Sequence, residues 1–322
     1  MALLQSPGRD TARLTGARLV AVAARDRARA EAFAAEHGVE RVLASYADVL
    51  ADPEVEAVYN PLANGLHGPW NLAAVAVGKH VLTEKPSASD AVEARAVRDA
   101  AADAGVVLME AFRYLYHPVT RRLLDVLGSG EIGELRHVEV HMGIPAPADA
   151  DPRWSLALAG GGLMDGGCCG LHLHRALAPF AGGEPRILAA KGRERAGHPG
   201  VDEWVEAELA FPGGATGVVH SSMAADDVRM SCRLVGSRGE ATAPFFVLPH
   251  RDDRVLVTAG GTERVEELGR RPSYAYQLEA FTAAVREGVP VPTDADDAVA
   301  TAELVDDCYR AAGFDPRPRT VL

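Results

Sequence analysis

The residues best placed to do chemistry stand in the stretch HVLTEKP, residues 80–86, where an apolar run ends in an acid, a base and a proline. The run predicts a short buried strand that stops at Pro86, because proline has no backbone N–H to donate. Ligands of open α/β sheets bind just beyond the carboxyl ends of strands, so Lys85 is predicted to lie at a reaction site. A partly desolvated lysine there can have its pKa lowered toward neutrality and transfer a proton. The alternative is a surface lysine paired with Glu84.

A second chemical group follows the glycines at 160–162 and contains Asp165, Cys169 and His172. An α-helix running from Asp165 to about residue 178 would place all three on one face, at about 100° per residue. A thiol titrates near ~8.5, so Cys169 could serve as an acid or base. It could also be a nucleophile activated by His172, or a small buried residue without a chemical role.

Two cysteines and two histidines of this helix also raise the question of zinc. Adjacent cysteines, here Cys168 and Cys169, point to different faces of a helix, and His174 points roughly opposite His172. Four ligands from one helix cannot close a tetrahedron without distortion. We therefore expect no metal at this helix.

Alternating strands and helices are predicted to position Lys85. The predicted strands are 19–22, 42–43, 55–59, the start of HVLTEKP and 106–109, and the predicted helices are 28–37, 46–50, 69–77 and 88–104. This alternation is typical of a doubly wound parallel sheet, that is, a Rossmann-like α/β domain. We assign it to residues 1–117.

The remainder, residues 118–322, is predicted to be an α+β domain with an open, mostly antiparallel sheet. The predicted strands are 135–142, 187–193, 205–211, 217–222, 230–236 and 255–257, and the predicted helices besides the one from Asp165 are 119–127, 276–286 and 297–311. The last two helices are expected to pack back on the first domain. One face of the sheet has no helix assigned to it, so we expect a homo-oligomer, at least a dimer, unless that face is polar, as Glu206 and Glu208 would make it.

Five motifs in order resemble the glucose–fructose oxidoreductase, inositol dehydrogenase and rhizopine-catabolism (Gfo/Idh/MocA) family. They are RLVAVAARD at 18–26, YNPLANGLH at 59–67, TEKP at 83–86, MEAFRYLYHP at 109–118 and GGGLMDGGCCGLH at 160–172. The resemblance covers nearly the whole chain and looks closest to the dihydrodiol/xylose dehydrogenase branch. It implies an oxidoreductase that uses NADP and acts on a sugar-like or hydroxylated small molecule.

The resemblance also implies roles for individual residues. Lys85 would be the proton donor or acceptor, Asp165 would orient the substrate, and His172 would contact a substrate hydroxyl. The family has its catalytic Tyr or His at the position of Cys169, which is a departure in this chain. The residues that the resemblance assigns to cofactor binding are Arg25, Asn60, Pro61, His67, Glu84, Arg113 and Trp154.

Arg25 and the loop residues have plainer alternatives. An arginine at the end of a strand suits the 2′-phosphate of NADP, where an acid would hold the ribose of NAD. Arg25 could equally be a solvated surface residue. Asn60 and His67 could be a capping residue and a surface histidine.

A G-x-G-x-x-G motif, which lets backbone N–H groups approach the pyrophosphate, does not precede Leu19. By the resemblance the printed sequence begins inside the first helix, after the glycine-rich loop. Either the gene start lies upstream, or the protein lacks the loop. In both cases the central strand of the sheet is missing, and its neighbours need other partners for their backbone groups. We expect weak NAD(P)H binding by this chain.

The missing motif and Cys169 leave two other functions open. One is a non-redox descendant, such as a lyase, cyclase or isomerase, that uses the same cleft. The other is a non-catalytic partner of a complete homologue.

Composition excludes several classes of partner. The chain has 322 residues, a net charge of −12 and four cysteines. The negative charge argues against nucleic acid and anionic membranes. No apolar run approaches ~18 residues, and the N-terminus has no signal-peptide pattern. Four cysteines in a chain this long make no disulfide framework, which points to a reducing, cytoplasmic location.

Overall fold

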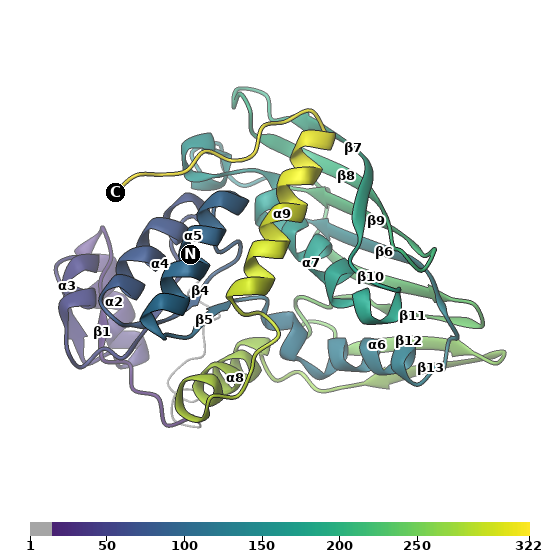
Figure 1. The fold of residues 1–322 in the computed structure, drawn as a ribbon, viewed down its shortest axis with the longest axis horizontal. Helices are drawn as coiled ribbons and strands as arrows, with labels where there is room; N and C mark the ends of the chain where they lie inside the picture. Colours follow the sequence, from purple (N-terminus) through teal and green to yellow (C-terminus); the bar gives the residue numbers. More distant parts are fainter. Residues whose placement is uncertain (1–14) are drawn as a thin grey trace.

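The computed structural model describes residues 15–322, in which parallel strands with flanking helices are followed by a large sheet (Figure 1). The first part contains β1 (Ala21–Val22), α2 (Arg27–His37), β2 (Arg41–Val42), α3 (Tyr46–Ala51), β3 (Ala57–Asn60), α4 (His67–Ala76), β4 (His80–Thr83), α5 (Ala91–Ala104) and β5 (Leu108–Glu110). The second contains α6 (Pro118–Gly128), β6 (Leu135–Gly143), α7 (Cys168–Ala176), β7 (Arg186–Glu194), β8 (Asp202–Ala210), β9 (Thr216–Ser222), β10 (Arg229–Gly236), β11 (Gly239–Ala243), β12 (Arg254–Ala259), β13 (Thr262–Glu267), α8 (Ser273–Glu287) and α9 (Ala295–Ala311). The predicted Rossmann-like and open-sheet classes are both confirmed.

Strands β3, β4 and β5 form the parallel sheet that carries Lys85. Leu82 of β4 lies in register with Tyr59 on one side and Met109 on the other. The helix between β4 and β5 ends at residue 104 as the sequence predicts, but it begins at Ala91, three residues after the predicted start. The Asp90 side chain accepts a hydrogen bond from the Glu93 N–H at the first turn, and Gly105 ends α5 in the left-handed conformation.

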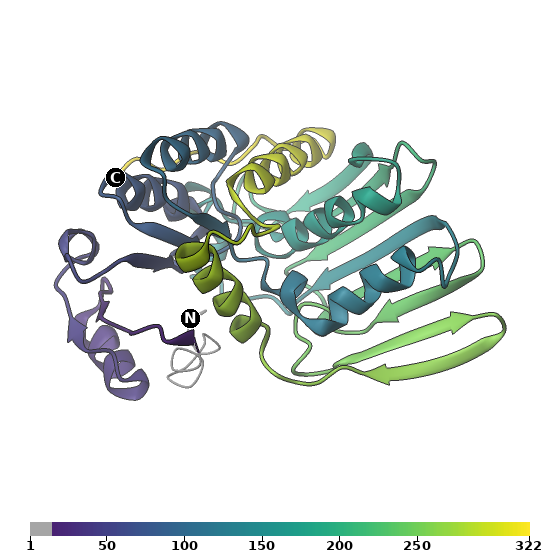
Figure 2. The same cartoon turned by 60° about the horizontal axis from the view of Figure 1, so that its bottom comes forward.

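The parallel strands are divided into two sheets in the part of the chain that the structure describes. β1 pairs only with β2, and β3, β4 and β5 form a separate sheet, with the two groups coloured purple and blue in Figure 2. The sequence analysis expects the central strand to be missing, and the N-terminal segment could take its position. Residues 1–14 of that segment lie outside the described residues, so this expectation stays a prediction.

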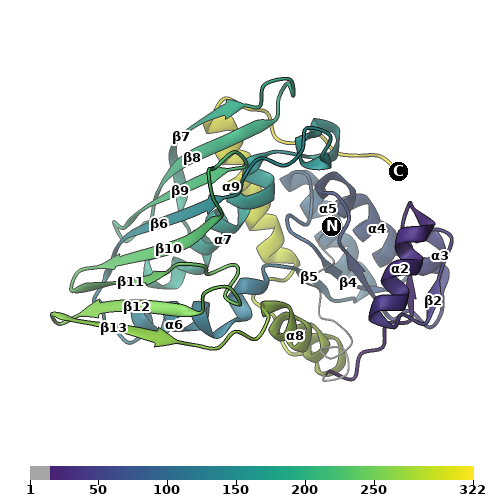
Figure 3. The ribbon, with the colours of Figure 1, turned by 180° about the vertical axis from the view of Figure 1, so that it is seen from behind.

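The large sheet has the order β13-β12-β11-β10-β6-β9-β8-β7 and is antiparallel except between β6 and β9. The sequence did not predict β11 and β13. Helices α6, α7 and α9 contact one face of the sheet, and Figures 2 and 3 show no helix of the described chain on the other. We call this other side the outer face. Glu206 and Glu208 lie on it, so it is charged, and self-association through it stays a prediction.

The segment around Asp165 differs from the predicted α-helix. Leu163–Gly167 forms a π-helical turn, in which the Cys168 N–H reaches back to the Leu163 carbonyl, and the α-helix α7 begins only at Cys168. A π turn is wider than an α turn, so the assumed spacing of about 100° per residue does not hold here. Such turns are frequent at functional sites.

A buried carboxylate fixes the start of this turn. Asp202 is fully buried at the beginning of β8 and accepts a hydrogen bond of 2.7 Å from the Leu163 N–H. Its other oxygen accepts hydrogen bonds from the Tyr309 hydroxyl at 2.9 Å and from Arg317 at 2.6 Å. Gly161 packs directly on this carboxylate, and a Cβ there would lie 2.0 Å from the Asp202 oxygen. The C-terminal segment therefore holds the turn that carries Asp165.

Helix α9 joins the two parts of the molecule. It packs against α5 of the first part and against α7 and β7 of the second (Figure 1). Asp306 of α9 accepts a hydrogen bond from the Ala91 N–H at the start of α5. Among the described residues, no helix is long and apolar enough to cross a membrane.

We predict that Arg317→Ala lowers the free energy of unfolding by about 3–5 kcal/mol, because it leaves the Asp202 carboxylate buried without its cation. Urea denaturation followed by circular dichroism would measure this. Arg319→Ala is the matched control. Arg319 pairs with Asp90 but its side chain is 55% exposed, so its loss should cost at most about 1 kcal/mol. Equal effects of the two substitutions would contradict the prediction.

Candidate active site

Lys85 joins the two parts of the protein at the carboxyl end of β4. Its ammonium group donates a hydrogen bond to the backbone carbonyl of Asp165, in the π turn. The peptide bond between Lys85 and Pro86 is cis. The side chain is partly buried, so it is not the exposed surface lysine of the alternative interpretation. The structure thus brings together the two motifs that the sequence singled out.

The charge state of Lys85 differs from the one predicted. Burial by itself disfavours the ammonium form, but the nearby Cys168, Asp165, Cys169 and Glu84 outweigh burial and raise the pKa above its ordinary value. The prediction of a pKa lowered toward neutrality is therefore wrong. At neutral pH Lys85 is a cation, suited to donate a proton or to stabilise negative charge on oxygen.

Glu84 is held in place beside Lys85. One carboxylate oxygen accepts a 2.8 Å hydrogen bond from the Tyr59 hydroxyl, and the other accepts the Lys85 backbone N–H at 3.3 Å. The Glu84 N–H donates to the Asn60 carbonyl at 2.9 Å. Burial, followed by the neighbouring Glu84 charge, raises the pKa of Tyr59 well above its ordinary value. Tyr59 is therefore a neutral donor, which the sequence analysis did not single out.

Hydrogen bonds of amide and imidazole side chains join the loop after β3 to the end of β4. The Asn60 amide donates to the Asn71 side chain at 2.8 Å and to the His67 carbonyl at 3.2 Å. The His67 ring nitrogens lie 2.7 Å from the Pro86 carbonyl and 2.9 Å from the Leu62 carbonyl. Burial lowers the pKa of His67. His67 is thus not a surface histidine, and Asn60 caps no helix.

The two adjacent thiols are both buried near the Lys85 ammonium group. The Cys168 thiol donates to the Met164 carbonyl at 3.1 Å. The neighbouring Cys168 thiol lowers the pKa of Cys169, against the effect of burial and with help from the Lys85 and Arg113 cations. Burial raises the pKa of Cys168 well above its ordinary value. Cys169 is therefore the more acidic of the two thiols.

His172 is fixed by two hydrogen bonds on opposite sides of its ring. Its Nδ1 lies 2.5 Å from the Tyr114 hydroxyl, and its Nε2 lies 3.0 Å from an Asp297 carboxylate oxygen. The ring also stacks on Phe112, with centroids 3.8 Å apart. A contact with a substrate hydroxyl, or a role as base for Cys169, would require one of these bonds to break. His172 consequently holds α7 to α9 and to the segment after β5.

The loop at residues 151–155, DPRWS, contacts the site through Arg153 and not through Trp154, the residue predicted to bind the cofactor. The Arg153 guanidinium lies 3.8 Å from the Asp165 carboxylate. Trp154 instead packs in a separate cluster with Val201 and Met223, and its indole N–H donates to a backbone carbonyl. This placement puts Arg153, which the sequence analysis missed, beside the candidate substrate-orienting Asp165.

Two arginines proposed for the cofactor differ in surroundings. Arg25 is exposed at the carboxyl end of β1, and the neighbouring Asp26 caps α2. Arg113 is buried, with its guanidinium 4.5 Å above the Tyr274 ring, and its Nε has no hydrogen-bond partner among the described residues.

The site fits the nicotinamide end of a dinucleotide. The carboxyl ends of β3 and β4 bring together Asn60, Pro61, Glu84 and Lys85, and the buried Arg113 has an unused donor nearby in the chain after β5. The described residues contain no glycine-rich turn for the pyrophosphate ahead of β1.

Two known protein families match the chain, one for each of its two parts. Residues 5–112 match a family described as an oxidoreductase family with an NAD-binding Rossmann fold. Residues 120–242 match the C-terminal domain of the GFO/IDH/MocA proteins. The fold and site are thus those of a Rossmann-type oxidoreductase. The chain belongs to the GFO/IDH/MocA family, as its motifs predicted. The predicted domain boundary at residue 117 lies between the two matched ranges and stays a prediction.

Individual relatives share most of the chain. It is 36% identical to D-xylose 1-dehydrogenase (NADP(+)) 2 of Haloferax volcanii over 294 residues, which are 91% of this chain and 89% of that protein. It is 36% identical to mouse trans-1,2-dihydrobenzene-1,2-diol dehydrogenase over 229 residues, 69% of this chain and 65% of that one. A solved 3-ketoreductase from Actinomadura kijaniata, in complex with NADP and TDP-benzene, has a TM-score of 0.86 and 28% identity, covering 97% of this chain and 95% of that one.

These relatives bear on the alternatives left open by the sequence. They favour an oxidoreductase over the non-redox descendant, and they support a nicotinamide dinucleotide as cofactor. The roles of the individual site residues stay predictions.

We predict that Lys85 stays protonated in the folded protein beyond the ordinary lysine pKa of ~10.4. The pKa of Lys85 is higher in the folded protein than in the unfolded chain, so protonation of Lys85 stabilises the fold at pH values below the pKa of the unfolded chain. This stabilisation is lost as the pH rises through the pKa of the folded protein. The chain has three lysines, Lys79, Lys85 and Lys191, so ¹³Cε-lysine NMR can follow each one. Lys85→Arg assigns the resonance, and the urea-unfolded chain is the reference. A Lys85 signal that titrates near pH 7 to 9 would contradict the prediction.

Proposed function

We propose that this protein is an NADP-dependent oxidoreductase that interconverts a hydroxyl and a carbonyl group on a sugar-like or vicinal-diol substrate. The observation that carries the proposal is the Lys85 ammonium group, which donates a hydrogen bond to the Asp165 carbonyl at the junction of the two sheets, while the Lys85 backbone N–H donates to Glu84. The relatives named for D-xylose and for a trans-1,2-diol act on compounds with hydroxyl groups on adjacent carbons. A further relative, from Saccharopolyspora spinosa, is named as a 3-reductase of a dTDP-3,4-didehydro-dideoxy sugar, which has carbonyl groups on adjacent carbons.

The cofactor, when bound, supplies or accepts the hydride. Lys85 would donate a hydrogen bond to the substrate oxygen and stabilise the negative charge that develops there. In the direction of reduction, the same ammonium group can transfer its proton to that oxygen as the alcohol forms. In the direction of oxidation Lys85 must take this proton back, so it first passes its own proton to a neighbouring base, and Cys169 is the candidate because its pKa is lowered.

The remaining residues would hold the two ligands. We assign Asn60, Pro61, His67, Glu84 and Arg113 to the nicotinamide end and Arg25 to the 2′-phosphate of NADP. Asp165, with Arg153 beside it, would orient the substrate. Trp154 is not needed in this assignment, because Arg153 provides the contact of its loop with the site.

Lys85→Ala should reduce turnover by on the order of 100-fold, because a preorganised cation is lost where charge develops. Cys169→Ala should cost less than about tenfold if the thiol only accepts a proton that water can take instead. The assay follows NADPH formation with D-xylose, other aldoses and vicinal diols, and each variant is checked by thermal melting.

Near-normal turnover by Lys85→Ala would remove the basis of the proposed mechanism. Complete loss in Cys169→Ala alone would favour a thiol nucleophile and therefore non-redox chemistry.

Arg25→Ala should weaken NADPH binding by about tenfold, or about 1.4 kcal/mol, and leave NADH binding unchanged, because only NADPH carries the 2′-phosphate. Fluorescence titration of both nucleotides measures this. Arg29→Ala, an exposed arginine in the first turn of α2, is the control. If both variants weaken NADPH equally, or NADH falls in parallel, Arg25 does not read the phosphate. The same titration of the unaltered chain tests the expectation of weak binding, which a low-micromolar dissociation constant would contradict.

A further inference from the structure

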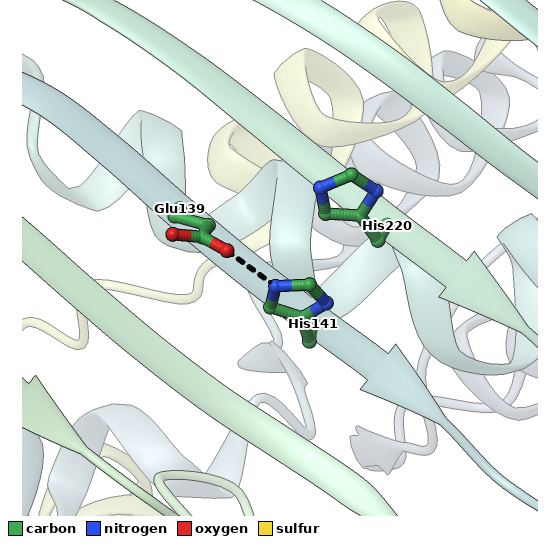
Figure 4. A group of neighbouring side chains, drawn as sticks. All are labelled: Glu139, His141 and His220. Carbon is green, nitrogen blue, oxygen red and sulfur yellow. Dashed lines mark hydrogen bonds and ion pairs between the residues drawn. The ribbon is translucent and has the colours of Figure 1, made fainter.

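A cluster of metal-ligating side chains lies on the outer face of the large sheet, apart from the active site. Glu139 and His141 are two residues apart on β6, so strand alternation places them on the same face. His220 of the neighbouring strand β9 is in direct register with His141. The parallel pairing of β6 and β9 therefore brings three potential ligands side by side (Figure 4).

The three side chains converge closely enough to share one ion. One ligand atom from each lies within 4.8 Å of the others. His141 Nε2 is 2.6 Å from Glu139, and the two imidazole rings are stacked with centroids 4.4 Å apart. Figure 4 shows a nitrogen of each ring on the side of the Glu139 carboxylate. Ligand atoms of a tetrahedral zinc ion are about 3.4 Å apart, given Zn–N bonds of about 2.0–2.1 Å, so small side-chain rotations would close the site.

A fourth residue orients one of the imidazoles. The Glu206 carboxylate on β8 lies 2.9 Å from His220 Nδ1, which leaves Nε2 of that ring for an ion. Lys191 binds the same carboxylate at 2.7 Å. Metal-binding histidines usually donate their second N–H to a carboxylate in this way, which fixes the tautomer and the ring orientation.

The chemistry of the donors selects the ion. Two imidazoles and one carboxylate suit zinc and related divalent transition metals, whereas calcium and magnesium require oxygen ligands. Arg233 lies 3.8 Å from Glu139 and competes for that carboxylate. All four cysteines are buried, so they supply no thiolate on this face.

We propose that Glu139, His141 and His220 bind a zinc-class divalent transition metal ion on the outer face, with water completing the coordination. Glu206 is the residue that positions His220. The sequence analysis considered metal only at the Cys-His helix and missed this cluster, because β6 and β9 are far apart in the chain and their pairing is set by the sheet topology.

The test is a titration of untagged, chelator-treated protein with Zn²⁺ in competition with a chromophoric chelator. We expect one equivalent to bind with a low-micromolar dissociation constant. His141→Ala and His220→Ala should each weaken binding by more than about 100-fold, and Glu206→Gln by about 10-fold or more. Co²⁺ should give visible absorption bands without a thiolate charge-transfer band.

His137→Ala is the matched control, because His137 lies on β6 four residues from His141 and its Nδ1 is 2.7 Å from the Thr216 hydroxyl, outside the proposed ligand set. It should bind Zn²⁺ as the unaltered protein does. Thermal melting confirms that each variant is folded. Absence of stoichiometric Zn²⁺ binding overturns the proposal, as does binding that survives in both His141→Ala and His220→Ala. A thiolate band with Co²⁺ also overturns it, since the ion would then lie elsewhere.

Discussion

The hydrogen bond from the Lys85 ammonium group to the Asp165 carbonyl is the contact on which the geometry of the active site depends. The donor stands at the end of a parallel strand and the acceptor in a π turn of the other part of the chain, 80 residues away. Neither element alone forms a site. The strand end is fixed by Glu84, Tyr59 and Asn60, and the turn is fixed by Asp202. Because both ends are held, the ammonium group is preorganised before any ligand arrives.

The positive charge of Lys85 follows from this arrangement. Two thiols and the carboxylates of Asp165 and Glu84 lie near Lys85, which also binds one backbone carbonyl, so the cation is retained although the site is largely buried. The same cation lowers the pKa of Cys169. A position that family members fill with Tyr or His is filled here by a smaller group whose pKa is lowered. The site thus has one fixed positive charge with a titratable sulfur beside it.

The sequence predicted the strand that carries Lys85 because an apolar run ending in Glu-Lys-Pro is a local signal. It also predicted the family, because the motifs occur in order. It could not predict that His172 binds Asp297, since those residues are 125 positions apart and Asp297 stands in an ordinary acidic helix start. The π turn was missed because it depends on a hydrogen bond from Leu163 to a distant carboxylate. The pKa of Lys85 was predicted with the wrong sign because desolvation was counted without the neighbours that tertiary packing supplies.

A continuous series of contacts leads from Arg317 to Asp202, from Asp202 to the Leu163 N–H, and along the π turn to the carbonyl that Lys85 binds. Thermodynamic coupling between two sites is reciprocal. If anchoring of the C-terminal segment stabilises the π turn, a ligand that stabilises the π turn must stabilise the anchored segment by the same free energy. Occupation of the active site should therefore hold the segment around Arg317 more firmly to β8, and slower amide hydrogen exchange there would report events at Lys85. Hydrogen exchange in the last residues of the chain would then report the state of Lys85 from a distance.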